Sequence, residues 1–245
     1  MNTSIRMKKI LLVEDHQFII NVIHELLSSV GFKNVDKAPN AETAIDMMAA
    51  VRYDLVISDV EMGAVNGIEL LKMIRCAQTK LPVDTRVIIL TSHANMQVLG
   101  AAMALDVNGF LVKPAKLNTT VEKIQKAFEE TFRPRKSIAY SVVNTAVIDK
   151  PEEEQPEAAE PAAEAQEQES ERDNQLVGAP VSTTGHIEKV ILEGLEEDMM
   201  LAEPIKNAKG MVLMPAGHKL SASNINRLQE LKEQLADSFA RVYVS

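Results

Sequence analysis

The chain has 245 residues, a length that suits one and a half to two domains at roughly 100–200 residues each. A hydrophobic fraction of 46% with 25% charged residues is typical of a globular protein and excludes fibrous and disulfide-rich classes. Cys76 is the single cysteine, so no intrachain disulfide can form, and no apolar run approaches the ~18 residues of a membrane helix. We therefore expect a cytoplasmic protein without membrane contact.

The net charge of −9 is concentrated in one segment. Residues 151–175 hold ten acidic side chains against Arg172, so the rest of the chain is neutral and offers no basic footprint for nucleic acid. This stretch is rich in Pro, Ala, Glu and Gln and has no aromatic or β-branched residue, which predicts a disordered acidic linker over 150–185. The expected organisation is an N-terminal domain (1–133), an extension of undecided structure (134–149), the linker, and a small module (186–245).

The N-terminal domain alternates short apolar runs with stretches of helical periodicity. Runs such as ILLV, LVIS and VIIL are typical of strands buried on both faces of a parallel sheet. The first helical stretch predicts a buried stripe of Phe18, Val22, Leu26 and Leu27. Five such repeats predict an α/β fold, a doubly wound five-stranded parallel sheet. The expected strands are Lys8–Val13, Asn34–Ala38, Leu55–Ser58, Arg86–Thr91 and Phe110–Val112.

Chemically active side chains follow four of these strands. Glu14 and Asp15 end the first strand, Asp59 the third, Thr91 the fourth and Lys113 the fifth. In a parallel sheet these ends meet at one edge, where ligands bind. Clustered carboxylates raise one another's pKa unless a cation neutralises them, and hard oxygen ligands suit Mg²⁺. No glycine follows the first strand, which excludes dinucleotide and P-loop sites.

The order and spacing of LLVEDH, LVISDVEM, NGIEL, VIILTSHA and GFLVKPA resemble the receiver domains of two-component response regulators, over roughly residues 7–130. The resemblance implies a flavodoxin-like fold in which Asp59 accepts a phosphoryl group from a sensor histidine kinase or a phosphotransfer protein. It implies that Asp15, Asp59 and the backbone carbonyl of Glu61 ligate Mg²⁺, with Glu14 acting mainly through water.

The same resemblance implies roles for the remaining site residues. Lys113 would pair with the phosphoryl oxygens, and a cis bond between Lys113 and Pro114 would direct the ammonium into the site. Thr91 would move to hydrogen-bond the phosphoryl group, and Phe110 would follow it inward as an aromatic switch. Two features depart from the family: Gly63 replaces the usual proline after the acceptor, and Glu61 and His93 flank the site at variable positions.

Other readings of these residues are less specific. Asp59 and Glu61 faintly resemble the nucleophile motif of haloacid-dehalogenase-type phosphatases, but the required second aspartate is missing. Phe110 is also read as an ordinary core aromatic. His16, His24 and His218 lack metal-ligand spacing and are expected to be surface or cap residues. Cys76 is expected to be an inert thiol.

The C-terminal module has apolar segments punctuated by glycine, followed by one amphipathic helix capped by Ser221 and a final strand at Arg241–Val244. This pattern predicts a ββαβ-like α+β unit. The segments LEGLEEDMMLAEPI and GMVLMPAGHKLS resemble the region that precedes the catalytic core of HD-GYP-type response regulators, but the His-Asp and Gly-Tyr-Pro motifs of that core are missing. A single helix also argues against direct DNA binding.

Together these features predict a response regulator that is not an enzyme beyond accepting, and itself removing, a phosphoryl group. Its output would be contact with an unknown downstream protein, with homodimerisation possible through 134–149. The alternative is a non-catalytic regulatory subunit in cyclic-di-GMP signalling; Lys219, Arg227 and Arg241 are candidate phosphate ligands for it, although three scattered cations usually form a solvated face.

Overall fold

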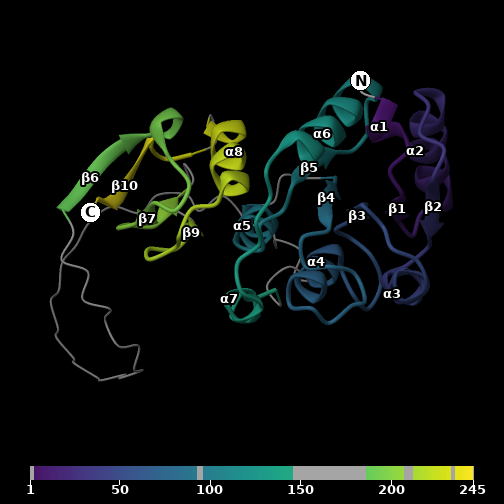
Figure 1. Cartoon of the computed structure of the whole chain (residues 1–245), viewed down its shortest axis with the longest axis horizontal. Helices are drawn as coiled ribbons and strands as arrows, with labels where there is room; N and C mark the ends of the chain where they lie inside the picture. The colour runs from purple at the N-terminus through teal and green to yellow at the C-terminus, as the bar shows by residue number, and fades with distance from the viewer. Residues whose placement is uncertain (1–2, 93–95, 146–185, 207–211, 233–234, 245) are drawn as a thin grey trace, which may run out of the picture.

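The computed structural model describes residues 3–92, 96–145, 186–206, 212–232 and 235–244 (Figure 1). The acidic segment expected to be a linker lies outside these residues. Within them, no helix is both long enough and apolar enough to cross a membrane. The N-terminal part contains α1 (Thr3–Arg6), β1 (Ile10–Val13), α2 (Gln17–Ser29), β2 (Val35–Ala38), α3 (Ala41–Ala50), β3 (Leu55–Asp59), α4 (Gly67–Arg75), β4 (Arg86–Thr91), α5 (Met96–Ala104), β5 (Gly109–Val112), α6 (Leu117–Glu129) and α7 (Ser137–Ser141).

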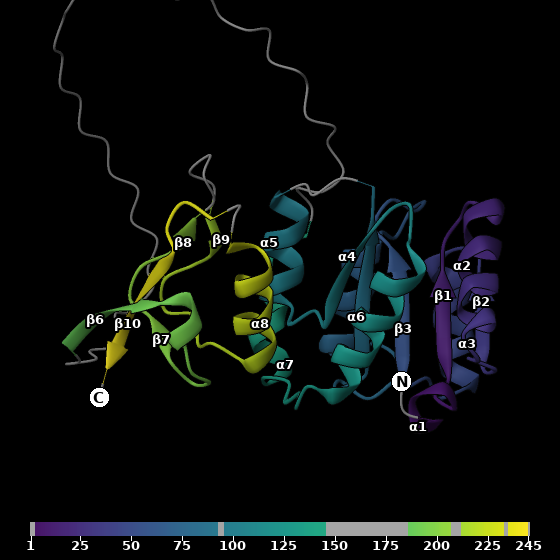
Figure 2. The same ribbon diagram turned by 90° about the horizontal axis from the view of Figure 1, so that it is seen from above.

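The five strands of this part form one parallel sheet in the order β2-β1-β3-β4-β5. The sequence prediction of a doubly wound five-stranded sheet is therefore confirmed. All side chains of β1 and β3 are buried, as expected of strands covered on both faces. Helices α2 and α6 cover one face, and α3, α4 and α5 cover the other (Figure 2).

The stripe predicted for the first helix was wrong in part. Phe18 is 80% exposed and Val22 43% exposed, whereas Ile20, Ile23 and Leu27 are buried against the sheet. The helix carries two apolar stripes, because QFIINVIHELL has apolar residues at helical spacing on both sides. The path of the chain from β1 into α2 decides which stripe faces the sheet, and periodicity alone does not contain that information.

The extension after α6 packs on the outside of α4. Tyr140 in α7 is fully buried, and its hydroxyl donates a hydrogen bond of 2.7 Å to Asp106 Oδ2. Lys72 Nζ of α4 donates to the Val143 carbonyl at 2.7 Å. The extension therefore forms a short helical strap that joins α4 to the turn before β5.

The C-terminal module contains β6 (His186–Ile191), β7 (Met200–Leu201), β8 (Ile205–Lys206), β9 (Val212–Met214), α8 (Ala222–Glu230) and β10 (Phe239–Val244). Strands β6 and β7 flank β10 in an antiparallel sheet, and β8 pairs with β9. Four short strands therefore precede the helix where the sequence predicted two. Ser221 caps α8 as predicted, by accepting from the Asn224 backbone amide.

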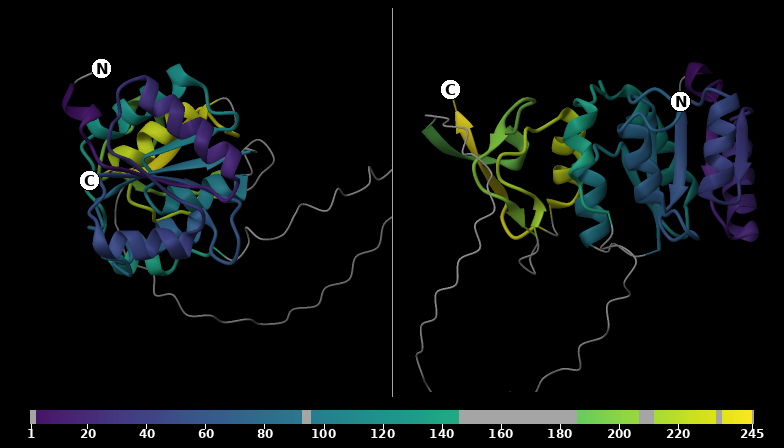
Figure 3. Two further views of the ribbon diagram at one scale, coloured as in Figure 1. Left: turned by 90° about the vertical axis from the view of Figure 1, so that its right-hand side faces the viewer. Right: turned by 90° about the horizontal axis from the view of Figure 1, so that it is seen from below.

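The module lies directly against the N-terminal part. Figures 1, 2 and 3 show α8 and β9 beside α5, between the module's strands β6 and β10 and the parallel sheet. Leu213, Leu220 and Leu228 of the module belong to the same buried apolar cluster as Val98 and Met103 of α5. The two parts thus share one continuous core, which suits a module too small to bury a large core alone.

Candidate functional site

The predicted site residues lie at the carboxyl edge of the parallel sheet. Glu14 and Asp15 follow β1, Asp59 ends β3, Thr91 ends β4 and Lys113 follows β5. Glu14, Asp59 and Thr91 are 2%, 1% and 4% exposed, so these groups sit below the surface. Asp15, at 39% side-chain exposure, and Glu61 are open to solvent.

Lys113 links two of the carboxylates directly. Its Nζ lies 2.7 Å from Glu14 Oε2 and 2.9 Å from Asp59 Oδ2. The Lys113 backbone amide donates to the Thr91 carbonyl at 2.8 Å, and the Lys113–Pro114 bond is cis. The Lys113 ammonium, at the end of β5, therefore contacts the carboxylates of Glu14 after β1 and Asp59 in β3.

The pKa values of Asp59 and Lys113 are both shifted by their surroundings. Burial raises the pKa of Asp59 to about 6; Lys113 opposes the shift, and the neighbouring Glu14 carboxylate adds to it. Burial alone would lower the pKa of Lys113, but its contacts with Glu14 and Asp59 outweigh that and raise it. A strongly perturbed carboxyl group at a strand end is typical of a functional site.

A divalent cation fits the oxygen atoms at this edge. Carboxylate oxygens of Glu14 and Asp15 and a ring nitrogen of His16 lie within 4.8 Å of one another. Asp59 Oδ1 is buried and has no hydrogen-bond partner among the described residues. Hard oxygen donors and an unsatisfied carboxylate oxygen match the requirements of Mg²⁺. Asp59 and the Glu61 side chain lie outside this close group, whereas His16, which was not predicted as a site residue, lies within it.

Asn66 and Gly67 fix the backbone beneath Asp59. Asn66 caps α4 through the Ile68 and Glu69 amides, and the Glu69 side chain accepts from the Asn66 amide. A Cβ on Gly67 would lie 1.9 Å from the Asp59 carbonyl oxygen, so only glycine fits there. The sequence showed this pair as a helix start but not its contact with Asp59.

The remaining candidates lie nearby. Phe110 is 9% exposed and belongs to the core on the α4–α5 face. Gly63 is exposed, and a Cβ added there would meet nothing within 4 Å; His93 lies outside the described residues. The switch role of Phe110 stays a prediction.

Two expectations for the C-terminal module were wrong. Arg227, predicted on a solvated face, is 1% exposed and His218 is 8% exposed. Arg227 bonds to Asn108 of the N-terminal part, and His218 lies between Arg135 and Asn224. Lys219 and Arg241 pair with acidic side chains of the module, so the three candidate phosphate ligands do not converge. Arg227 and His218 are buried by contacts with the N-terminal part and its extension, which the sequence of the module alone does not indicate.

Comparison with known proteins agrees with the geometry of the sheet edge. The family model for the response regulator receiver domain matches residues 10–125. Chemotaxis protein CheY-3 of Vibrio cholerae is 35% identical over 123 residues, which is 49% of this chain and 92% of that protein. Chemotaxis protein CheY of Pseudomonas aeruginosa is 36% identical over 124 residues, 49% of this chain and 96% of that protein.

A solved structure of the chemotaxis response regulator CheY4 of Vibrio cholerae is 27% identical, covers 49% of this chain and 98% of that chain, and has a TM-score of 0.45. The family match ends before the C-terminal module. The resemblance of that module to the HD-GYP group therefore stays a prediction.

Proposed function

Because the chain belongs to the response regulator receiver family, we propose that it is a phosphorylation-controlled response regulator with Asp59 as its phosphoacceptor. The observation that carries the proposal is the contact of Lys113 Nζ with Asp59 and Glu14, beside a buried Asp59 oxygen without a partner among the described residues. The donor would be a histidine kinase or a phosphotransfer protein. The output would be contact with another protein.

In the proposed reaction an Asp59 carboxylate oxygen attacks the phosphorus of a phosphohistidine. A P–O bond forms, the P–N bond breaks, and the imidazole leaves with the bonding electron pair. Bound Mg²⁺, held by Glu14, Asp15, Asp59 and the Glu61 carbonyl, would supply positive charge that neutralises the phosphoryl oxygens. Lys113 pairs with one of those oxygens, and the Thr91 hydroxyl donates to another.

Loss of the phosphoryl group needs no further catalytic residue. A water molecule attacks phosphorus, the P–O bond to Asp59 breaks, and the carboxylate is restored with release of phosphate. Glu61 is exposed at this edge, and we expect its carboxylate to influence how easily water approaches the phosphoryl group. We therefore propose that the protein removes its own phosphoryl group.

Intact-mass measurement with acetyl phosphate tests the assignment. The wild-type chain should gain one phosphoryl group in Mg²⁺ and none in chelator, and Asp59→Asn should gain none. Asp54→Asn is the matched control, because Asp54 lies just before the opposite end of β3 and pairs with Lys8. Phosphorylation of Asp59→Asn, or loss of it in Asp54→Asn alone, would refute Asp59 as the acceptor.

A further inference from the structure

The three-stranded sheet of the C-terminal module has apolar side chains on both of its faces. Ala240 and Val242 of β10 are 3% and 0% exposed and point into the core of the module. Because side chains alternate along a strand, the residues between and beside these two point to the other side of the sheet. These residues and their cross-strand neighbours, which together form the outer sheet face, are Ile187, Lys189, Ile191, Met200, Phe239, Arg241 and Tyr243.

The apolar side chains of the outer sheet face are open to solvent. Ile187 is 48% exposed and Ile191 61% exposed, and Phe239 and Tyr243 are only partly buried. A sheet with one solvated face normally places polar side chains on that face, but five of the seven side chains here are apolar. Exposed apolar patches of this kind mark sites of interaction. The outer sheet face therefore has the composition of a surface that a second layer covers.

The other two side chains of this face are cations that lie opposite each other. Arg241 pairs directly with Lys189 across the strands, and like charges in that arrangement destabilise a sheet. Lys189 Nζ lies 3.5 Å and Arg241 Cζ 5.5 Å from the centre of the Phe239 ring, whose electrons offset part of the repulsion. Arg241 pairs with Glu203, whereas Lys189 has no acidic partner among the described residues. A negatively charged group above the middle of the face would therefore complete the pairing.

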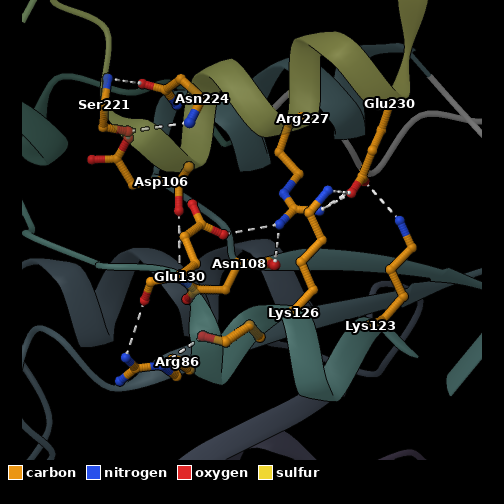
Figure 4. Close-up of polar contacts among 12 residues, drawn as sticks. Arg86, Asp106, Asn108, Lys123, Lys126, Glu130, Ser221, Asn224, Arg227 and Glu230 are labelled. Atoms are coloured by element: carbon orange, nitrogen blue, oxygen red, sulfur yellow. Dashed lines mark hydrogen bonds and ion pairs between the residues drawn. The ribbon is translucent and has the colours of Figure 1, made fainter. Parts of the chain in front are cut away.

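The side of the module that carries α8 is already occupied by the receiver. Arg227 Nη2 of α8 donates to the Asn108 carbonyl at 2.6 Å (Figure 4). Glu230 of α8 contacts Lys123 and Lys126 of α6, each at 2.7 Å. Figures 1 and 2 show β6 and β10 at the end of the module farthest from the parallel sheet. The outer sheet face therefore lies away from the receiver, where another molecule can reach it.

The dimensions of the outer sheet face suit one α-helix. Strands β6 and β10 have six residues each, which gives a length of about 20 Å, the length of a helix of about 14 residues. Three strands give a width of about 10 Å, which is the diameter of a helix. Glu188 and Lys189 stand in the middle of the edge strand β6, and charges on an edge disfavour the addition of a further strand. A helix across the face is therefore favoured over a strand beside it.

Charge and side-chain size distinguish among the candidate occupants. A second copy packed face to face about a two-fold axis would bring four cations together. The acidic segment 151–175 of this chain has the right charge, but it contains no Leu, Ile, Val, Met or aromatic residue to cover the exposed apolar groups. Residues 186–245 carry seven cationic and nine acidic side chains, a net charge of −2 that opposes a nucleic acid. A protein segment with both acidic and large apolar side chains meets every requirement.

We propose that the outer sheet face is the output surface of the module and that it binds an acidic amphipathic helix of another protein. The inference rests on the proposed function in one respect, that the output is contact with a protein. The apolar side of the helix covers Ile187, Ile191 and Phe239 and removes them from water. Glutamate or aspartate side chains beside that apolar stripe reach Lys189 and Arg241.

Fluorescence anisotropy of a labelled synthetic peptide, titrated with the full chain, tests this surface. The glutamate probe is a helix of about 14 residues with leucine on one side and glutamate on both flanks; the lysine probe has lysine in place of each glutamate. The wild-type chain should bind the glutamate probe at least about tenfold more tightly than the lysine probe. Lys189→Glu should abolish this preference and should still fold, because glutamate opposite Arg241 is a favourable pair. Lys37→Glu is the matched control, an exposed lysine on the edge strand β2 of the receiver.

The apolar half of the surface has its own variant. Ile191→Ser removes a side chain that is already exposed, so it should leave the free energy of unfolding unchanged but weaken binding of the glutamate probe by about tenfold. Equal affinities for the two probes, or equal effects of Lys189→Glu and Lys37→Glu, would overturn the proposal. So would tighter binding of oligothymidine than of the glutamate probe, or a dimer in light scattering that Lys189→Glu dissociates.

Intact mass after acetyl phosphate and Mg²⁺ separates this inference from the proposed function. A wild-type chain that gains a phosphoryl group but does not bind the glutamate probe refutes the outer sheet face and leaves Asp59 as the acceptor. A chain that prefers the glutamate probe but gains no phosphoryl group refutes the proposed function and leaves the surface.

Discussion

Replacing Arg227 by methionine should destabilise docking by about 3 kcal/mol. Removing one partner of a buried ion pair costs about 3–5 kcal/mol, because the other partner stays buried and unpaired. Glu230 keeps Lys123 and Lys126 as partners, so the loss falls mainly on Glu130 and the Asn108 carbonyl. This places the effect at the lower end of the range, and methionine preserves most of the packing of the aliphatic stem.

Urea denaturation followed by far-ultraviolet circular dichroism and tyrosine fluorescence measures the loss as a change in the free energy of unfolding; the chain has no tryptophan, and one of its three tyrosines, Tyr243, lies in the module. Arg241→Met is the matched control, because its guanidinium is 44% exposed and surface pairs contribute about 0–1 kcal/mol. The double variant Arg227→Met, Glu130→Gln should lose at least about 1 kcal/mol less than the sum of the single variants. An Arg227→Met effect no larger than that of Arg241→Met, or additive single effects, would refute a coupled buried pair.

Three further predictions concern His218, Arg75 and Lys113. Burial lowers the pKa of His218, with Arg135 adding to the shift and Asn224 and Asp106 opposing it, so the unfolded chain binds the proton more readily. The free energy of unfolding should therefore fall as the pH drops below 6.5, the ordinary pKa of histidine. Thermal melts should show this fall in the wild type and in His24→Gln, and a smaller fall in His218→Gln. Arg75→Met should lower the free energy of unfolding by about 4 kcal/mol or more, because the fully buried guanidinium donates to the carbonyls of Val83, Thr85, Leu105 and Asp106; a urea midpoint near wild type would contradict this. Lys113→Ala should still bind Mg²⁺, because the proposed metal ligands are oxygen atoms, but it should gain a phosphoryl group from acetyl phosphate more slowly by intact mass, because Lys113 no longer contacts Asp59; loss of Mg²⁺ binding in this variant would contradict the assignment.

The parallel sheet was predictable because its signal is local. ILLV, LVIS and VIIL are continuous apolar runs, and only strands buried on both faces need such runs. The candidate site follows from the same observation, since a parallel sheet brings all its carboxyl ends to one edge. The individual contacts within the site are not encoded locally, however. The proximity of His16 to Glu14 and Asp15 is visible only in the folded structure.

The docked module was not predictable for the same physical reason. Arg227 and His218 look like solvated residues in their own segments, and the groups that bury them lie about a hundred positions earlier in the chain. Phe18 is the opposite case: it belongs to an apolar stripe in the sequence, but its side chain is exposed to solvent. Periodicity identifies candidate faces, and tertiary contacts select among them.

The position of β10 also determines when the module can fold during synthesis on the ribosome. This strand lies between β6 and β7, so the module's sheet cannot close until residues 239–244 have been synthesised. The receiver and its extension are complete by residue 145, and translation at about 5–20 residues per second leaves roughly 5–20 seconds before β10 emerges. During that interval α5 presents an uncovered surface in every nascent chain. Small residues at Gly100, Ala101 and Ala104 limit the apolar area that α5 exposes in this interval, and Val98 and Met103 contribute the larger groups of the core that it later shares with the module.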